Sequence, residues 1–304
     1  MTPDSERLIT YYLLLITYYL IMPIPAIQWY PGHIAKAERQ LQEQIKKVDV
    51  VLEVRDARIP LATYHPLLTN WIGNKHKLLV LNRVDMIPLA VKDAWTEWFL
   101  AQGEQPFFAN SQQGTGVVAI SKAAQSVGVA INAKRKERGM LPRPVRAVVI
   151  GFPNVGKSAL INRLVNKRAV ESARRAGVTR SLRWVRISDQ LELLDAPGII
   201  PGRLNDREAA VKLAICDDIG EAGYDRQSMA AAFIELCQEL GYIDGLNARY
   251  GSVPTTLSGE EYLHNLANQK YRGDLERTSH LILNDFRTGI LGHIPLELPT
   301  KPDP

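Results

Sequence analysis

The chain has 304 residues, of which 46% are hydrophobic and 23% are charged, the composition of an ordinary globular protein of about two domains. Its net charge of +5 gives a moderate preference for anionic partners. The two cysteines, Cys216 and Cys237, fit no zinc-binding spacing, and no histidine cluster accompanies them in the sequence. We therefore expect no zinc site, two buried thiols and a reducing, cytoplasmic setting.

Residues 8–21 form a near-perfect tandem repeat, LITYYLL followed by LITYYLI. This apolar run is shorter than the ~20 residues that span a bilayer, and acidic residues precede it where a signal peptide would be positive. Three interpretations are open: a weak membrane anchor, an interaction strand, or a segment outside the fold of a protein whose translation begins at Met22. We favour the third, so residues 1–25 are expected to be an extension with no stable membrane span.

An aromatic turn at residues 27–33 opens the predicted fold, with Pro31 and Gly32 as its turn residues. A helix follows, because apolar residues recur at steps of three and four from Ile34 to Val48. Strands then alternate with helices, the strands at 49–54, 77–81 and 106–110 and the helices at 93–101 and 117–133. This alternation predicts an α/β fold with a mostly parallel sheet flanked by helices, whose ligands bind at the carboxyl ends of the strands.

A phosphate-binding loop is predicted at residues 151–158, GFPNVGKS, because it separates an apolar β-branched run at 145–150 from a helical pattern at 159–164. Its glycines let backbone N–H groups converge on phosphate oxygens, and the helix dipole points at the same anion. Lys157 can reach the β- and γ-phosphates, and Ser158 can ligate Mg²⁺. The predicted nucleotide contacts in this segment are Asn154, Val155, Gly156, Lys157, Ser158 and Ala159.

Positive charge gathers on both sides of this loop, with Glu171 as the one acid between residues 161 and 187. The cations before and after the loop are Lys134, Arg135, Lys136, Arg138, Arg143, Arg146, Arg163, Lys167, Arg168, Arg174, Arg175, Arg180, Arg183 and Arg186. A solvated basic face is one interpretation. We favour contact with a nucleic-acid backbone, without sequence specificity, because no base-reading motif accompanies the charges.

The last third of the chain reads as helical. Before this helical region, residues 182–187 and 191–194 are predicted to form two adjacent strands around a turn. From residue 205 the period is helical, and a capping box at Ser258 opens one of the helices. We therefore predict an α/β domain at 26–203 and a separate all-helical domain at 204–304, with a loose, proline-rich tail after Gly292.

Residues 82–85, Asn-Arg-Val-Asp, resemble the N-K-x-D element with which GTPases recognise guanine. Asp85 can accept hydrogen bonds from guanine N1–H and N2–H₂, which adenine cannot supply, while Asn82 would brace the neighbouring loops. Arg83 replaces the usual lysine, and its planar side chain could stack on the purine. Ser111, at the end of the next strand, resembles the residue whose backbone N–H meets guanine O6. The alternative is that these are ordinary turn residues at strand ends.

Two further motifs resemble the γ-phosphate sensors of GTPases. Thr179 resembles the switch threonine that ligates Mg²⁺, and residues 195–198 resemble D-x-x-G. In that motif Asp195 would hold a Mg²⁺-bound water and the Gly198 N–H would meet the γ-phosphate. Each motif alone is weak, but all of them at strand ends around one phosphate loop are hard to explain by chance.

The order of these motifs is unusual, because the base-recognition elements precede the phosphate loop that they normally follow. This order resembles the circularly permuted GTPases. Within that group WYPGH (29–33), DARIP (56–60), GFPNVGKS (151–158) and DAPGI (195–199) resemble the ribosome biogenesis GTPase A family. The resemblance runs from about residue 27 to 291. It implies a circularly permuted P-loop GTPase domain and a helical C-terminal domain that bind the ribosome, mainly the ribosomal RNA backbone, in late assembly of the large subunit.

The resemblance also implies a mechanism, hydrolysis of GTP to GDP and phosphate with stimulation by the subunit. Ile199 stands where many GTPases carry a water-orienting glutamine, so the isolated enzyme should be slow. The resemblance implies that His33 positions the water, alongside Lys157 and Gly198; the alternative is that His33 caps the following helix. It further implies that Asn154 coordinates K⁺, the alternative being an asparagine that only stabilises the loop. Ala176 replaces a common proline before Gly-Val-Thr, which should loosen the switch slightly.

Three other functions stay open at this stage. A small-subunit assembly GTPase usually carries an added zinc module or OB-fold domain, and neither is visible in the sequence. A membrane-associated signalling GTPase would use residues 8–21 as its anchor. A nucleotide-dependent RNA-binding module without useful turnover is the third, although Thr179 and Asp195 favour hydrolysis.

Overall fold

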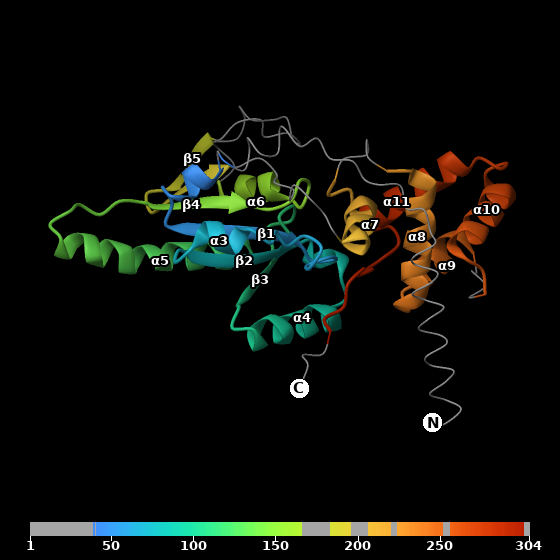
Figure 1. The fold of residues 1–304 in the computed structure, drawn as a ribbon, viewed down its shortest axis with the longest axis horizontal. Coiled ribbons are helices and arrows are strands. Elements are labelled where there is room, and N and C mark those ends of the chain that lie inside the picture. The colour runs from blue at the N-terminus through green and yellow to red at the C-terminus, as the bar shows by residue number, and fades with distance from the viewer. Residues whose placement is uncertain are drawn as a thin grey trace, which may run out of the picture.

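The structure, a computed structural model, describes residues 39, 41–165, 183–195, 206–219, 224–251 and 256–300. Figure 1 shows two parts, a sheet flanked by helices and a group of helices beside it. Within the described ranges, no helix is long and apolar enough to cross a membrane. The repeat at 8–21 lies outside these ranges, as do His33, Ala176, Thr179 and Gly198.

In the part of the chain that the structure describes, six strands form one sheet in the order β3-β2-β1-β4-β6-β5, and of these only β5 runs antiparallel to its neighbour. Every residue of β1 is buried, as expected for a central parallel strand whose two faces are both covered by helices. The predicted mostly parallel α/β sheet is confirmed. The strands are β1 Val50–Asp56, β2 His76–Asn82, β3 Pro106–Ala109, β4 Val145–Ile150, β5 Arg183–Ser188 and β6 Leu191–Asp195.

Alternating side chains of the sheet divide its helices into two layers. Val51 and Leu79 face residues 41–45, α3 (Leu68–Ile72) and α4 (Leu89–Ala101). Leu52 and Val149 point the other way, into the core shared with α5 (Val117–Glu137) and α6 (Lys157–Leu164). A short 3₁₀ turn, η1 (Val84–Met86), follows β2. The carboxyl ends of β1, β2 and β4 lie side by side at one edge of the sheet, the edge at which such sheets bind ligands.

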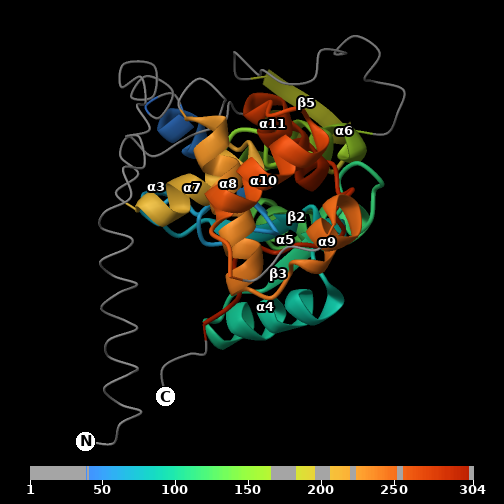
Figure 2. The same cartoon turned by 90° about the vertical axis from the view of Figure 1, so that its right-hand side faces the viewer.

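The helical part packs around its own aromatic pair, Phe233 and Phe286, whose ring centroids are 4.6 Å apart. Figure 2 shows these helices facing the viewer. The capping box at Ser258 is confirmed, since its side chain and that of Glu261 each accept from the other's backbone N–H. Both cysteines are buried, as expected. The helices are α7 Arg207–Cys216, α8 Arg226–Glu239, α9 Asp244–Tyr250, α10 Gly259–Lys270 and α11 Leu275–Arg287.

The segment after Gly292 runs back to the sheet and its helices, and Figure 1 shows it as a red coil. The predicted loose tail is therefore wrong up to Glu297. Ile294 and Leu296 are 2% and 1% exposed, and the backbone N–H groups of Leu296 and Glu297 both donate to the Arg58 carbonyl. Proline content indicates looseness, but the apolar residues on either side of Pro295 bury enough surface to fix the segment. We call residues 292–298 the C-terminal strap.

Candidate nucleotide site

The loop between β4 and α6 has the backbone geometry of a phosphate cradle. Gly151 lies so close to β1 that a Cβ atom there would come within 2.2 Å of the Val54 carbonyl oxygen. Gly156 has a φ of +97°, which side chains rarely adopt, and leads directly into α6. The loop therefore delivers a helix N-terminus to the carboxyl end of β4, where backbone N–H groups and the dipole favour an anion.

Lys157 begins α6 and is only 7% exposed. Its Nζ donates to the carbonyl of Phe152, at 2.6 Å, so the side chain curls over the loop that it follows. Ser158 lies in the first turn of the same helix. Asp195 ends β6 and pairs in register with Val149 of β4, which places its backbone at the same edge of the sheet as the loop. The predicted phosphate and metal residues that the structure describes thus converge on one end of the sheet.

Asn82 ties the base motif to the phosphate loop. Its Nδ2 donates to the Val155 carbonyl at 2.8 Å, and its Oδ1 accepts from Ser111 N at 3.0 Å and from Ser111 Oγ at 2.7 Å. The bracing role predicted for Asn82 is the geometry observed. The same contact occupies the Ser111 N–H, which we expected to meet guanine O6. In this structure the Ser111 N–H and hydroxyl both donate to Asn82. A hydrogen bond to guanine O6 would therefore need another N–H group or a movement of Ser111 away from Asn82.

Arg83 departs from the expected stacking position. It has a positive φ of 63°, and its Nη2 donates to the Asn154 carbonyl at 2.8 Å. Its Nε lies 3.5 Å from Oδ2 of Asp56. The planar fork of arginine reaches both acceptors at once, which a lysine ammonium on a single stem does less readily. Arg83 thus bridges the phosphate loop and the end of β1.

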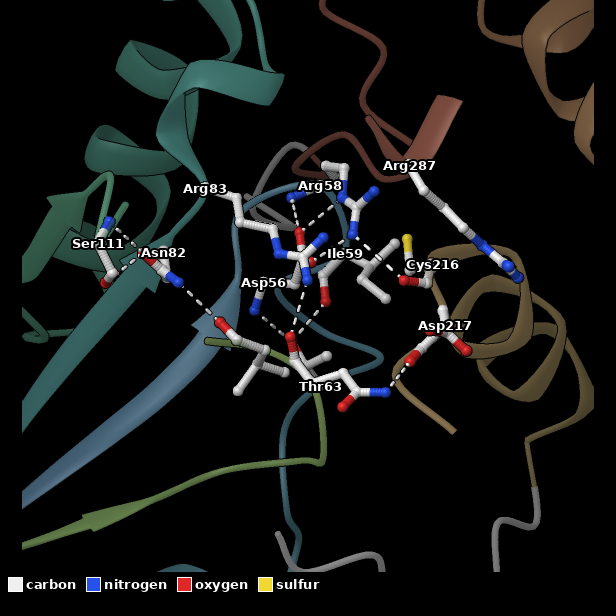
Figure 3. A network of polar contacts seen from close by, with 12 residues as sticks. Asp56, Arg58, Ile59, Thr63, Asn82, Arg83, Ser111, Cys216, Asp217 and Arg287 are labelled. Carbon is white, nitrogen blue, oxygen red and sulfur yellow. Dashed lines mark hydrogen bonds and ion pairs between the residues drawn. The ribbon is translucent and has the colours of Figure 1, made fainter. Parts of the chain in front are cut away.

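Asp56 and Arg58 form a fully buried ion pair beside this bridge, at the centre of Figure 3. Arg58 Nε and Nη2 donate to the two carboxylate oxygens at 3.0 and 2.7 Å. Burial by itself raises the pKa of Asp56, but the positive charges of Arg58 and Arg83 outweigh it and hold that pKa below its usual range. The sequence identifies DARIP only through its resemblance to a family motif, and its local pattern does not indicate these partners.

A cavity of about 530 Å³ lies between residues that follow the strands of the sheet and residues at the ends of α7 and α11. Its wall on the helical side, which the sequence did not predict, includes Cys216 and Asp217 at the end of α7 and Arg287 and Thr288 at the end of α11. Asn154 reaches this side directly, because its Nδ2 donates to the Asp217 carbonyl at 2.6 Å. The sheet-side wall includes seven predicted nucleotide contacts, Asn82, Arg83, Asp85, Ser111, Asn154, Gly156 and Ala159.

This fold and this site define a class, the P-loop GTPases with permuted motif order: the base motif after β2 and Ser111 after β3 precede the loop after β4. Residues 146–234 match the family model described as "50S ribosome-binding GTPase". The ribosome biogenesis GTPase A of Bacillus cereus is 34% identical over 283 residues, covering 90% of this chain and 95% of that protein. Its counterpart in Bacillus pumilus is 33% identical over 281 residues, covering 90% and 99%.

The solved structure described as GNP-bound YlqF from T. maritima shares the fold, with a TM-score of 0.60 and 24% identity over 88% of this chain and 99% of that one. The chain belongs to the ribosome biogenesis GTPase A family. It is a GTP hydrolase that binds guanine nucleotide and acts in ribosome assembly. His33, Thr179 and Gly198, the remaining predicted site residues, lie outside the described ranges.

Proposed function

We propose that this GTPase hydrolyses GTP to GDP and phosphate in late assembly of the large ribosomal subunit, and that the subunit stimulates turnover. The observation that carries the proposal is the position of the nucleotide cavity, walled on one side by the base motif and phosphate loop and on the other by the helical domain. A ribosomal subunit that binds the helical domain would therefore contact helices whose ends, those of α7 and α11, line the nucleotide cavity.

Asp85 is exposed at the cavity rim and would accept the guanine N1–H and N2–H₂. Lys157 would release the Phe152 carbonyl to reach the β- and γ-phosphates. Ser158 would ligate Mg²⁺ directly, with Thr179 as a second ligand and Asp195 acting through a water. The hard oxygen donors of this set suit Mg²⁺, which supplies neutralisation of the charge that develops on the phosphates. The Gly198 N–H would complete the γ-phosphate contacts.

Asn154 is the proposed K⁺ ligand. Its Nδ2 is committed to the Asp217 carbonyl, so the amide must present Oδ1 on its opposite side, and an amide oxygen is the atom that binds a hard cation. His33 is the proposed water-positioning residue, because Ile199 cannot hydrogen-bond a water. Subunit binding would bring His33 to the site.

Ribosomal RNA phosphates are the proposed main contact in the cytoplasm. Support comes from the edge strand β5, where Trp184 is 41% exposed and the Arg146 guanidinium lies 5.7 Å from its ring centre. Arg186 is mostly exposed, in a surface ion pair with Asp189 that phosphates can replace at little cost. Positively charged groups around an exposed aromatic are typical of RNA-binding surfaces.

The test measures GTP turnover alone, with large subunits and with small subunits, in buffers containing K⁺ or Na⁺. We expect stimulation by large subunits only, lost in His33→Ala, and a rate in K⁺ that exceeds the rate in Na⁺. Unstimulated wild type would reject the large-subunit assignment, and full stimulation of His33→Ala would remove that residue from the mechanism. Equal rates in the two salts would remove K⁺. Binding that is insensitive to salt would contradict a phosphate-dominated interface.

A further inference from the structure

The DARIP segment, residues 56–60, has no task in the mechanism above, although its charged residues are fully buried. Asp56 ends β1 and Arg58 follows two residues later, both at 0% exposure. Burying an ion pair costs several kcal/mol unless its remaining hydrogen-bonding groups are satisfied, so its partners indicate what it does. Those partners lie in two different places, the nucleotide site and the helical domain.

On the nucleotide side, Asp56 contacts Arg83 of the base motif, with Oδ2 and Nε 3.5 Å apart. Arg83 in turn donates to the carbonyl of Asn154 in the phosphate loop. The backbone continues the link, because the Ala57 N–H donates to the Asn82 carbonyl at 2.8 Å. A displacement of the base motif would therefore change the contacts of Asp56 and of the neighbouring Ala57 backbone.

On the helical side, Arg58 makes the connection. Its Nη2 lies 3.5 Å from the Cys216 carbonyl at the end of α7, and its guanidinium carbon lies 4.9 Å from the ring centre of Phe286 in α11. Its own carbonyl accepts both strap N–H groups, from Leu296 and Glu297.

The strap also accepts hydrogen bonds from Leu61 and Ala62, the next residues of the loop after β1. The Glu297 carboxylate accepts from the N–H groups of Leu61 and Ala62, at 2.7 and 3.1 Å. One short loop after β1 therefore holds α7, α11 and the strap together.

We propose that Asp56 is a positioning residue that couples guanine-nucleotide binding to the docking of the helical domain, acting through Arg83 on one side and Arg58 on the other. The inference rests on the proposed nucleotide site. A nucleotide in a cavity between two bodies binds the docked arrangement more tightly than the open one, so it stabilises that arrangement. The coupling is reciprocal, since a helical domain held in place also raises nucleotide affinity.

Hydrogen–deuterium exchange of the full chain, with and without saturating GDP, tests this coupling. In wild type, GDP should slow exchange at residues 151–158 and also in α7, α11 and the strap, by about fivefold or more. Arg83→Gln removes the side-chain link on the nucleotide side, at a partly exposed position, and leaves the backbone bond between Ala57 and Asn82 in place, so the variant should fold. At its own saturating GDP concentration it should keep the protection at 151–158 and lose it in α7, α11 and the strap.

Arg186→Gln is the matched control, the same substitution at an exposed ion pair on β5 that does not line the cavity, and it should show the wild-type pattern of GDP protection. Protection at 151–158 without any change in α7, α11 and the strap of wild type would overturn the coupling and leave the nucleotide site standing. Unchanged protection of those helices in Arg83→Gln would overturn it as well. Absence of GDP protection at 151–158 in wild type would overturn the proposed site and the coupling together.

Discussion

Asn82 is the residue whose replacement most directly tests the architecture of the site. It is 3% exposed, and its side chain makes three hydrogen bonds, one to Val155 and two to Ser111. Asn82→Ala removes all three and leaves the Val155 carbonyl and the Ser111 N–H without this partner. At about 1 kcal/mol for each hydrogen bond, the free energy of unfolding should fall by about 3 kcal/mol, and by more if the abandoned groups stay dry.

Asn82→Asp distinguishes the acceptor contacts of Asn82, made to Ser111, from its donor contact to Val155. The carboxylate keeps the acceptor for Ser111 but sets an oxygen against the Val155 carbonyl, 2.8 Å from the atom it replaces. We expect a loss of about 1–3 kcal/mol at neutral pH, concentrated in the phosphate loop. Protonation of the new carboxyl would restore a donor to Val155, so the deficit should shrink in acid.

The assay is denaturant unfolding with and without GDP, together with the GDP dissociation constant. Ser111→Ala, which removes one of the three bonds, is the graded control and should lose about 1 kcal/mol. Because the loop is braced for phosphate, GDP affinity should fall at least tenfold in Asn82→Ala. Wild-type stability and wild-type GDP affinity in that variant would refute the idea that Asn82 holds the base motif and the phosphate loop together.

Three further predictions follow from single contacts. Gly156→Ala should abolish GDP binding in an equilibrium titration, because its Cβ would lie 2.1 Å from Asn82 Nδ2 at a φ of +97°. Asn154→Ala should remove any excess of turnover in K⁺ over Na⁺, measured by phosphate release. Burial raises the pKa of Glu297 from 4.5 to about 7, despite the opposing charge of Lys212. The folded chain then binds more protons than the unfolded chain between those values, so unfolding free energy should fall by about 3 kcal/mol as pH rises through that window, and Glu297→Gln should flatten this slope.

The sheet and the phosphate loop could be predicted because their signals are local. Each strand is a short run that contains several apolar residues, and the glycines at 151 and 156 have the spacing of a phosphate-binding loop between a strand and a helix. The brace from Asn82 to Ser111 was also predictable, since the carboxyl ends of neighbouring parallel strands meet at one edge of the sheet.

The helical wall of the cavity could not be predicted, because its contacts join residues far apart in the chain. Arg58 and Cys216 are separated by 158 positions, and no periodicity or turn signal connects them. The strap was misjudged for a related reason. Proline indicates the absence of regular structure, but Ile294 and Leu296 find their partners in other segments and are fixed by them. The sequence indicates only that Arg83 could stack on the purine, because its bridge depends on Asp56, which lies on another strand.

The position of Asp56 follows from strand order more than from its own neighbours in the sequence. β1 lies between β2, which ends in the base motif, and β4, which ends in the phosphate loop. A side chain at the carboxyl end of β1 therefore lies between the two halves of the nucleotide site, and Asp56 contacts the base motif directly and the phosphate loop through Arg83. The loop that leaves β1 must still cross the same edge of the sheet, and here it meets α7, α11 and the strap. Under the proposed coupling, a residue at this point can link nucleotide binding to the position of the helices. Asp56 is suited to this role because its buried carboxylate is shared by two arginines. If either arginine moves away, part of the buried negative charge is left without compensation.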